Sequence, residues 1–384
     1  MCSKTPVFRS AVRRSLLAAG FAGLVAALAV PAAASALPTA PQLRRDVARA
    51  VAAGVPGVIV LVRDGPRTVS VAGGSARLKP RAPMRVDDRF RIASLTKTYV
   101  ATVVLQLAGE GRLSLHDTVE RWLPGMVPNG QHITLRHLLN HHSGLFDYFN
   151  DLQVLQPYLE GDLSRTWTPE QLVAISVAHP PVFAPGARPP AFPTGRNEAY
   201  SNTNYILLGL VVQKVTGRPV GTELGRRIFE PLALRATSFP TGQRIPGRHA
   251  HGYFFASPGK PVDATATSPT HSWAAGAIVS TAADVARFYR ALLSGRLLRP
   301  ALLRSMQTVT DGYGLGIGPR PGTCRVRWGH EGEVAGYNSV AVSTRDGRRQ
   351  LVMLYNAHSP RGGFGTTRGR RALERLFDTG ACTG

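Results

Sequence analysis

Short apolar, β-branched runs occur near both ends of this chain, and their placement constrains the fold more than any other feature. Asp64-Gly65-Pro66 separates the first two runs and Asp346-Gly347 separates the last two. Turn residues between apolar runs predict β-hairpins. We therefore expect both ends of the chain to supply strands to one antiparallel sheet. The runs are residues 58–62, 68–71, 325–328, 337–343 and 350–354.

The middle of the chain shows helical periodicity in place of such runs. Pro- and Gly-rich connections divide the helices, and the longest, residues 180–195, predicts an irregular loop. The pattern predicts a two-lobed α/β (α+β) fold. Its sheet lobe would be about 37–92 plus 311–384 and its mostly helical lobe about 93–310, with a cleft between them. The predicted helices are residues 41–53, 94–111, 134–140, 169–178, 202–216, 282–294 and 369–377.

Residues 1–36 have the pattern of a secretory signal peptide. Basic residues precede an apolar run from Leu16 to Val30, and Ala34-Ser35-Ala36 then forms a small-x-small cleavage site. A membrane anchor is the alternative, but the run is shorter than the ~20 residues that a spanning helix needs. We expect a secreted, extracytoplasmic protein whose mature chain is residues 37–384. The sequence leaves the Sec and twin-arginine routes open.

The formal net charge is +23, which raises the question of anionic partners. The arginines are scattered, without a basic block or an aromatic-interleaved stripe, and this argues against nucleic acid. Anionic cell-wall polymers are the expected partners of an exported protein with this charge. A compositional bias toward arginine is the alternative explanation of the charge, and we favour it. We expect a monomer with no stable membrane span in the mature chain.

The chain has three cysteines, and Cys2 would leave with the signal peptide. Cys324 and Cys382 then form an even pair in an oxidising compartment, where a disulfide between them is plausible. Two buried thiols are the alternative.

The segment around Ser94 places this serine one helical turn before Lys97. Only five of the 46 Lys and Arg residues are lysine. Arginine stays protonated in proteins, whereas a buried lysine can lose its proton and act as a base. At this spacing the two side chains share a helix face, and the helix N-terminus favours negative charge at the serine. A serine that only caps the helix is the alternative.

Tyr200-Ser201-Asn202 stands at the start of another predicted helix. A phenol and an amide two residues apart on a turn can both point into a cleft. Tyr200 could relay a proton, and Asn202 could bind a substrate amide or hold Lys97. Core packing of the ring and helix capping by the amide are the structural alternatives.

A third segment carries His330 and then Gly332 between two glutamates. Glycine in a strand lets the backbone approach a ligand closely. The N–H groups of this strand could pair with a peptide and, with the N–H of Ser94, form an oxyanion hole. Because side chains alternate along a strand, Glu331 and Glu333 would lie on the same face of it. A structural role is the alternative for His330.

Three motifs stand in the order and spacing of the class C β-lactamase and DD-peptidase family, and the chain resembles this family. It is most similar to the secreted Streptomyces D-alanyl-D-alanine carboxypeptidase type, in which His replaces the usual Lys of Lys-Thr-Gly. Further similar stretches are residues 133–145, 275–281 and 313–316, and both remaining cysteines fall where that type has its disulfide. The motifs are Ser94-x-x-Lys97, Tyr200-x-Asn202 and His330-x-Gly332.

The resemblance implies a serine β-lactamase/DD-peptidase-like fold and a role for each motif residue. Ser94 would be acylated, and Lys97 and Tyr200 would transfer its protons. The N–H groups of Ser94 and Glu333 would form the oxyanion hole, and Trp273 would wall the pocket. No cofactor or metal is implied. The implied substrate-binding residues are Asn202, Trp273, His330, Glu331, Gly332 and Glu333.

The chain departs from this family pattern where a free substrate carboxylate would bind. The pattern has hydroxyl residues at the positions of Glu331 and Glu333, and its arginine is replaced by Gly318, although Arg320 is close. Like charges about 4 Å apart cost roughly 1 kcal/mol in water and more in a drier cleft. If the two glutamates face the pocket, a substrate with an amine, amide or ester there fits better than a carboxylate.

His137 and His141 are four residues apart, with His142 beside them, which is a spacing that zinc sites use. No glutamate follows His137 in the metalloprotease pattern. The same stretch matches a structural segment of the family, so we expect no metal here.

These observations predict an exported serine hydrolase that acts through an acyl-enzyme at Ser94 on D-amino-acid peptides, as a D-alanyl-D-alanine carboxypeptidase-like enzyme. The glutamates motivate the alternative of a D-stereospecific aminopeptidase, endopeptidase or esterase. A β-lactamase is a third possibility in the same family. From a different class, the chain could be a non-catalytic penicillin-sensing or wall-binding module.

Overall fold

The computed structural model describes residues 37–160, 162–189, 199–257, 260–320, 327–359 and 366–382. The predicted signal peptide and Cys324 lie outside these residues, so the signal and the disulfide stay predictions. Within these ranges, no helix combines the length and apolar character that crossing a bilayer requires.

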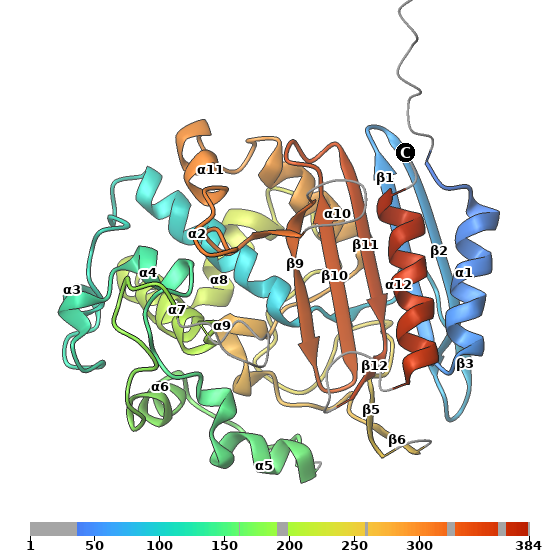
Figure 1. Cartoon of the computed structure of the whole chain (residues 1–384), viewed down its shortest axis with the longest axis horizontal. Coiled ribbons are helices and arrows are strands. Elements are labelled where there is room, and N and C mark those ends of the chain that lie inside the picture. The colour runs from blue at the N-terminus through green and yellow to red at the C-terminus, as the bar shows by residue number, and fades with distance from the viewer. Residues whose placement is uncertain are drawn as a thin grey trace, which may run out of the picture. The chain divides into compact units, whose positions relative to one another are not determined.

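Seven strands form one antiparallel sheet, and both ends of the chain contribute to it as predicted (Figure 1). They are β1 (Gly57–Asp64), β2 (Arg67–Arg77), β3 (Ala82–Pro83), β8 (Gly318–Arg320), β9 (Arg327–Val334), β10 (Tyr337–Ser343) and β11 (Arg349–Tyr355). Their order in space is β3-β2-β1-β11-β10-β9-β8. β1 pairs with β11, from Val58 opposite Tyr355 to Asp64 opposite Arg349, so the two ends of the chain meet in the middle of the sheet.

The sheet is covered on both faces, which explains why β1 is apolar along most of its length. Val58 and Val60 pack on one face beneath α1 (Ala40–Ala52) and α12 (Thr367–Cys382). Ile59 and Leu61 point to the other face, which α10 (Ala282–Leu293) and the helical part cover. Each such side chain contributes about 1.5–3 kcal/mol when it is fully buried. Figure 1 shows α12 in front of the β1–β2 side of the sheet, running roughly along the strands.

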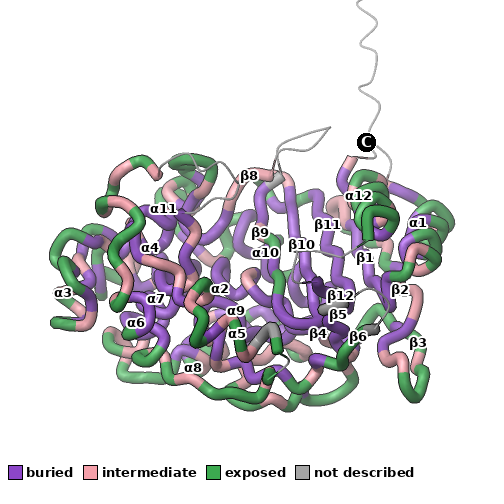
Figure 2. Tube along the Cα trace, turned by 60° about the horizontal axis from the view of Figure 1, so that its bottom comes forward, coloured by how far each residue is buried: buried purple, intermediate pink, exposed green. Residues whose placement is uncertain are grey.

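Two buried helices, α2 (Thr96–Gly109) and α7 (Thr203–Thr216), pass through the helical part. All side chains of α2 from Thr96 to Leu105 are buried, and a helix buried on every side belongs to an interior. In Figure 2 buried residues fill the middle of the molecule, and exposed residues lie mostly around its edge. The shorter helices are α3 (Val119–Trp122), α4 (Leu135–Leu139), α5 (Leu152–Glu160), α6 (Pro169–Val177), α8 (Val220–Leu224), α9 (Trp273–Gly276) and α11 (Pro300–Met306).

Local signals explain where several helices begin and end. Thr168 caps α6 through a capping box with Gln171, and proline follows as the first helical residue. α7 ends at Gly217, whose φ of 70° lies in the left-handed region that glycine adopts without strain. All seven predicted helices are confirmed. The described part of the predicted loop, residues 180–189, contains only turns and bends.

Several elements were not predicted from the sequence. α5 has no strong boundary signal, and Pro157 stands inside it. β9 is longer than the predicted run of residues 325–328, because its pairing with β10 continues to Val334 opposite Tyr337. Two small sheets complete the structure. Their strands are β5 (Tyr253–Ser257), β6 (Lys260–Asp263) and β12 (Ala357–His358) in one, and β4 (Phe90–Arg91) and β7 (Val279–Ser280) in the other.

Candidate active site

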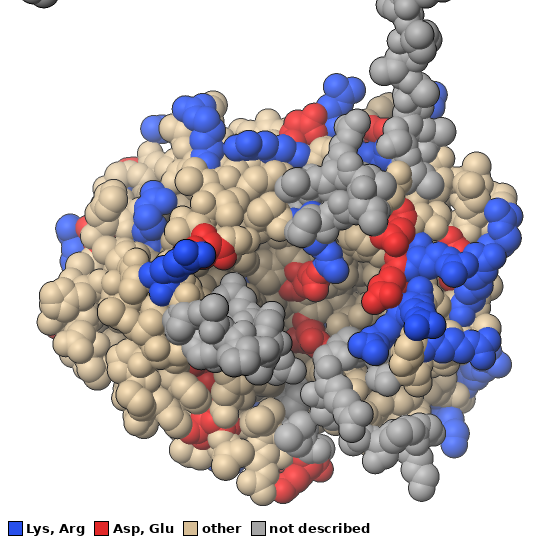
Figure 3. Space-filling view, in the orientation of Figure 1, with Lys and Arg blue, Asp and Glu red and all other residues tan. Residues whose placement is uncertain are grey.

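A cavity of about 850 Å³ lies where the helical part meets the end of β9. Figure 3 shows a hollow in the middle of this face, with acidic side chains inside it and arginines gathered over α12 and α1. Residues from distant parts of the sequence meet at the cavity. The lining residues that the sequence had singled out are Ser94, Tyr200, Asn202, His330, Glu331, Gly332 and Glu333.

Ser94 lies in a single 3₁₀ turn, η1 (Ala93–Leu95), that leads directly into α2. The sequence had placed it in the helix itself. Ala93 has a φ of 46°, and strained backbone of this kind clusters at active sites. The predicted approach of lysine to serine is present, because Lys97 Nζ lies 2.9 Å from Ser94 Oγ.

Lys97 is fully buried, and three acceptors surround its amine. Besides Ser94 Oγ, the amine donates to Asn202 Oδ1 at 2.7 Å and to the Ala275 carbonyl at 2.9 Å. Burial lowers the pKa of Lys97 to about 7, and the negative charge of Asp147 opposes this shift. A neutral lysine exposes a lone pair to the Ser94 hydroxyl, so this geometry lets Lys97 accept the serine proton.

Tyr200 is held between Ser94 and a histidine. Its ring packs on that of His141, with centroids 4.2 Å apart and the ring planes tilted by 31°, and its hydroxyl hydrogen-bonds Ser94. Lys97 Nζ lies 4.9 Å from the centre of the Tyr200 ring. Burial raises the pKa of Tyr200, and the hydrogen bond to Ser94 only partly opposes this. The phenol therefore keeps its proton at neutral pH and can donate it.

Asn202 joins Lys97 to a carboxylate that the sequence analysis had not singled out. Its Oδ1 faces Lys97, and its Nδ2 donates to Asp147 Oδ2 at 3.0 Å. The backbone N–H of Asn202 also donates to Asp147 Oδ1, at 3.1 Å. Asn202 thus holds Lys97, which is one of the two roles considered from the sequence.

His330 lies beside Tyr200 as the resemblance implied, with ring centroids 6.2 Å apart. Its Nε2 and the Tyr313 hydroxyl are 2.7 Å apart, and its Nδ1 contacts the Glu331 carbonyl. Burial, and then the charge of Lys97, lower the pKa of His330 to about 3. The ring is therefore neutral at pH 7 and adds polarity without charge beside the serine.

Gly332 is the point where β9 touches the serine turn. A Cβ at this position would lie 2.3 Å from the Ile92 carbonyl oxygen and 2.9 Å from the Ser94 nitrogen. Only glycine allows this approach. It places the backbone of β9, including the residue that follows Gly332, beside the N–H of Ser94.

Glu331 and Glu333 both line the cavity, as their alternation along the strand required. Their side chains are 57% and 39% exposed. Glu331 forms an ion pair with Arg320, and Glu333 Oε1 lies 3.3 Å from His358 Nε2. The arginine that could have received a substrate carboxylate is therefore already paired with a glutamate.

Trp273 is not among the residues that line the cavity, and its role in the pocket wall stays a prediction. Its ring lies against α7 at Gly209, where the missing side chain leaves room for it. Ser272, Ala275 and Gly276 form this part of the wall instead. A further part of the wall is largely aromatic or apolar and was not predicted. It includes Tyr148, Phe149 and Leu155.

The histidines near α4 take separate partners. His141 Nδ1 accepts the Ser201 N–H at 3.2 Å, and its ring packs on Tyr200. His142 Nε2 lies 3.0 Å from Asp311 Oδ2. His137 Nδ1 lies 3.3 Å from the Thr134 N–H, at the cap of α4. Each ring thus has a structural contact of its own.

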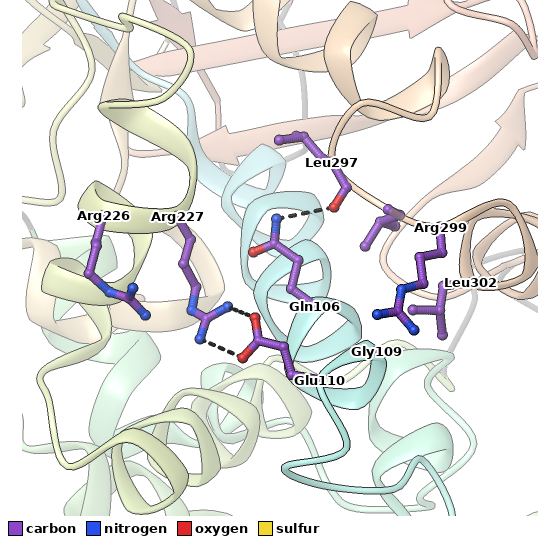
Figure 4. A pocket seen from close by; sticks show the side chains of 9 residues that line it. Gln106, Gly109, Glu110, Arg226, Arg227, Leu297, Arg299 and Leu302 are labelled. Atoms are coloured by element: carbon purple, nitrogen blue, oxygen red, sulfur yellow. Dashed lines mark hydrogen bonds and ion pairs between the residues drawn. The ribbon is translucent and has the colours of Figure 1, made fainter.

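A second cavity of about 360 Å³ lies at the opposite end of α2 (Figure 4). α2 separates it from Ser94 by about 20 Å, given the 1.5 Å rise per residue of a helix. Arg227 donates to both carboxylate oxygens of Glu110, at 2.5 and 3.0 Å, and Gln106 donates to the Leu297 carbonyl at 3.2 Å. These groups bind one another, and we assign the cavity no role.

Known proteins share both the sequence pattern and the fold. Residues 43–375 match the family model described as Beta-lactamase. Penicillin-binding protein 4* of Bacillus subtilis (strain 168) is 25% identical over 320 residues, which are 78% of this chain and 68% of that protein.

Two solved structures are similar over most of the chain. A D-stereospecific amidohydrolase from Streptomyces sp. has a TM-score of 0.79 and 37% identity, covering 90% of this chain and 100% of that one. A D-amino acid amidase from Ochrobactrum anthropi SV3 has a TM-score of 0.75 and 28% identity, covering 88% and 96%. The family match extends over most of the residues described here, and the chain therefore belongs to the Beta-lactamase family.

Proposed function

We propose that this serine hydrolase is a D-stereospecific amidohydrolase, which cleaves amides of D-amino acids or peptides with a D-residue on the acyl side. The observation that carries the proposal is the pair of glutamates on β9, both of which line the cavity beside Ser94. The amidohydrolase and amidase with similar structures support the same choice. This is the alternative of the sequence analysis, and it replaces carboxypeptidase activity as the preferred function.

The first half-reaction would acylate Ser94. Neutral Lys97 takes the hydroxyl proton as Oγ bonds to the substrate carbonyl carbon, and the N–H groups of Ser94 and Glu333 stabilise the oxyanion. Tyr200 then gives its phenol proton to the leaving nitrogen, which departs as ammonia or an amine. Tyr200 regains a proton from Lys97, which is again neutral.

The second half-reaction would free the enzyme. Water gives a proton to neutral Lys97 as its oxygen attacks the acyl carbon, and the Ser94–acyl bond then breaks. Ser94 regains its proton, and the D-amino acid or D-peptide acid leaves. No group besides the side chains and backbone already described is needed for this cycle.

Electrostatics oppose the carboxypeptidase alternative. A substrate with a free C-terminal carboxylate would place its charge near Glu331 and Glu333, and a like charge at about 4 Å costs roughly 1 kcal/mol even in water. Glu331 lies against Arg320 and offsets part of its positive charge, so this arginine compensates the repulsion less than a free one would. An amide or amine leaving group meets no such repulsion.

The test compares D- and L-phenylalanine amide, and a D-Ala-D-Ala peptide with its C-terminal amide, by kcat/KM. We expect the D-amide to exceed the L-amide, and the peptide amide to exceed the free acid at least tenfold. Ser94→Ala should abolish turnover and also any covalent penicillin adduct seen by intact mass. Preference for the free acid would refute the proposal. Absence of any adduct and of turnover in the wild type would favour the non-catalytic module.

A charge variant tests the stated cause. Replacing both glutamates, as Glu331→Thr with Glu333→Thr, removes two negative charges and leaves Arg320 unpaired. The ratio of acid to amide kcat/KM should then rise about tenfold or more, which corresponds to about 1.4 kcal/mol. Glu374→Thr, an exposed glutamate on α12, is the matched control and should leave the ratio unchanged.

We also propose that the protein acts outside the cytoplasm, near anionic cell-wall polymers. The signal-like pattern of residues 1–36 and the net charge of +23 support this. Amino-terminal sequencing of the protein from the culture medium tests it. A chain that keeps residues 1–36 and stays inside the cell would contradict it.

A further inference from the structure

Asp147 lies behind the active site, where it cannot touch a substrate directly. It is not among the residues that line the cavity. Its carboxylate accepts three backbone or side-chain N–H groups, from Asn202 and Phe149. Burial raises the pKa of Asp147, whereas these N–H groups and the charge of Lys97 lower it. All of these hydrogen bonds are accepted by the carboxylate, as its ionised form requires.

The Asn202 carboxamide can bridge Asp147 and Lys97 in only one orientation. Its NH₂ must face the carboxylate and its oxygen must face the amine, as observed. The flipped amide would place oxygen against oxygen on one side and donor against donor on the other. Asp147 thereby fixes the hydrogen-bond acceptor that Lys97 meets at 2.7 Å.

Among the described residues, Asp147 is also the group whose negative charge acts on Lys97. The other titratable groups around Lys97 come from four elements, and none of them supplies a negative charge at neutral pH. Burial raises the pKa of both tyrosines and lowers the pKa of both histidines, so all four stay neutral. They are Tyr200, Tyr205, His141 and His330.

We propose that Asp147 is a positioning residue that acts on Lys97 through Asn202, because it orients the Asn202 amide and its charge favours the protonated form of the buried amine. The inference rests on the proposed function only in taking Lys97 as the base. Burial alone would make the lysine a weaker base, one that is neutral at lower pH but holds the serine proton less well. The charge of Asp147 opposes this effect and raises the pKa of Lys97 toward about 7.

A purely structural role is the alternative, because Asp147 caps η3 (Tyr148–Asn150) by accepting the Phe149 N–H. Asparagine and serine cap helices about as well as aspartate. Asp147→Asn therefore keeps the cap and the shape but removes the charge. Asp147→Ser keeps the cap and also removes the reach to Asn202.

The experiment reads Lys97 directly by NMR. Only five lysines are present in the chain, so ¹³Cε-lysine labelling gives few signals, and Lys97→Met assigns the one of interest. We expect the midpoint of its titration to fall by about one pH unit or more in Asp147→Asn, as for a lost opposite charge at close range. The acid limb of kcat/KM should move to lower pH by the same amount.

Asp46→Asn is the matched control. Asp46 is a carboxylate 6% exposed on α1, held by Arg49 and Thr379, on the opposite face of the sheet. It should leave both midpoints in place. If Asp147→Asn does not fold by circular dichroism, Asp147→Ser takes its place with the same expectation.

An unchanged Lys97 midpoint in the folded variant would overturn the inference and leave the proposed function intact. The proposed function can also fail while the inference about Asp147 stands. If Ser94 proves not to be acylated, the proposed function fails, but the lysine titration still reports whether Asp147 acts on Lys97.

Discussion

At the residue scale, burial assigns different tasks to the two proton-carrying groups around Ser94. It lowers the pKa of Lys97 to about 7 and raises the pKa of Tyr200. A resting site at neutral pH thus holds a protonated phenol and a lysine that is partly neutral. Lys97 is the group able to take a proton first, and Tyr200 is the group able to give one. Activity should rise with pH through about 7, since the base must be neutral.

Tyr200→Phe tests this division. We expect the rate of Ser94 acylation to fall by about 10²–10⁴, the usual contribution of a proton donor, because the leaving nitrogen loses its acid. The midpoint of the acid limb should stay near 7, because Lys97 is unchanged. Stopped-flow acylation by a chromogenic amide or β-lactam between pH 5 and 9 measures both quantities.

Tyr99→Phe is the matched control for this substitution. Its hydroxyl is buried in α2 and has no hydrogen-bond partner among the described residues, so its loss should leave the rate unchanged. A Tyr200→Phe rate within threefold of the wild type, or a displaced acid limb, would show that Tyr200 is not the acid.

The residues of the site differ in how far the sequence could predict them. Ser94 and Lys97 interact over a fixed spacing of three, which a motif records. Asp147 meets Asn202 across 55 positions of sequence, and no local pattern links them. The direction of the Trp273 ring could not be predicted, because it depends on the space left by Gly209, which is a neighbour only in the folded chain.

At the element scale, the contact between β9 and the serine turn η1 makes the site. Ser339 Oγ, on the neighbouring β10, donates to the Ile92 carbonyl at 2.8 Å and fixes the turn to the sheet. Gly332 lets β9 approach from the side. The sequence predicted helices better than this strand, because caps and periodicity are local. β9 carries glycines and glutamates that line the cavity, and it lacks the apolar alternation of an ordinary strand.

Gly332→Ala should separate the two elements. The added methyl would lie 2.3 Å from the Ile92 carbonyl oxygen, so β9 or η1 must shift. We expect at least a hundredfold loss of kcat/KM, since misplacements of about 1 Å have effects of that size. Unfolding should also become easier by about 1–3 kcal/mol, the usual cost of overpacking. Amide hydrolysis and urea unfolding are the measurements.

Gly242→Ala is its control, because a Cβ there meets no atom within 4 Å. It should change neither quantity. Near-normal activity of Gly332→Ala would mean that the oxyanion geometry does not depend on this contact.

At the scale of the whole molecule, the pairing of β1 with β11 closes the chain on itself and leaves the helical part between its two strand-forming ends. The sequence predicted that both ends contribute to one sheet, because strand-like apolar runs occur near the two ends and the middle shows helical periodicity. It did not predict which groups would be buried with the site. Three buried or partly buried histidines lie near the cavity, and their protonation ties the stability of the fold to pH.

Burial lowers the pKa of His141, of His271 to about 4, and of His330 to about 3. Because an unfolded histidine titrates near 6.5, the unfolded chain binds more protons between about pH 4 and 6.5. The stabilisation from the neutral rings is therefore complete above pH 6.5 and is lost as pH falls. Each ring should lower the free energy of unfolding by about 1.5–2 kcal/mol when the pH falls from 7 to 5.

Carboxylates act in a different window. Burial alone would raise the pKa of Glu223, but its hydrogen bonds to Arg226 and Arg227 lower it, so its stabilisation is lost only in more acidic solution. Lys97 and Asp147 also have shifted pKa values, so urea unfolding at pH 7 and 5 is compared between the wild type and histidine variants. His271→Asn keeps a donor near the Ser268 carbonyl but has no ring that titrates. The loss of unfolding free energy between pH 7 and 5 should therefore be smaller in this variant, by the contribution of one ring. His116→Asn, at an exposed position, should not change this loss. The same change in the free energy of unfolding in His271→Asn as in the wild type would contradict the prediction, because the variant lacks one of the rings that resist protonation in the fold.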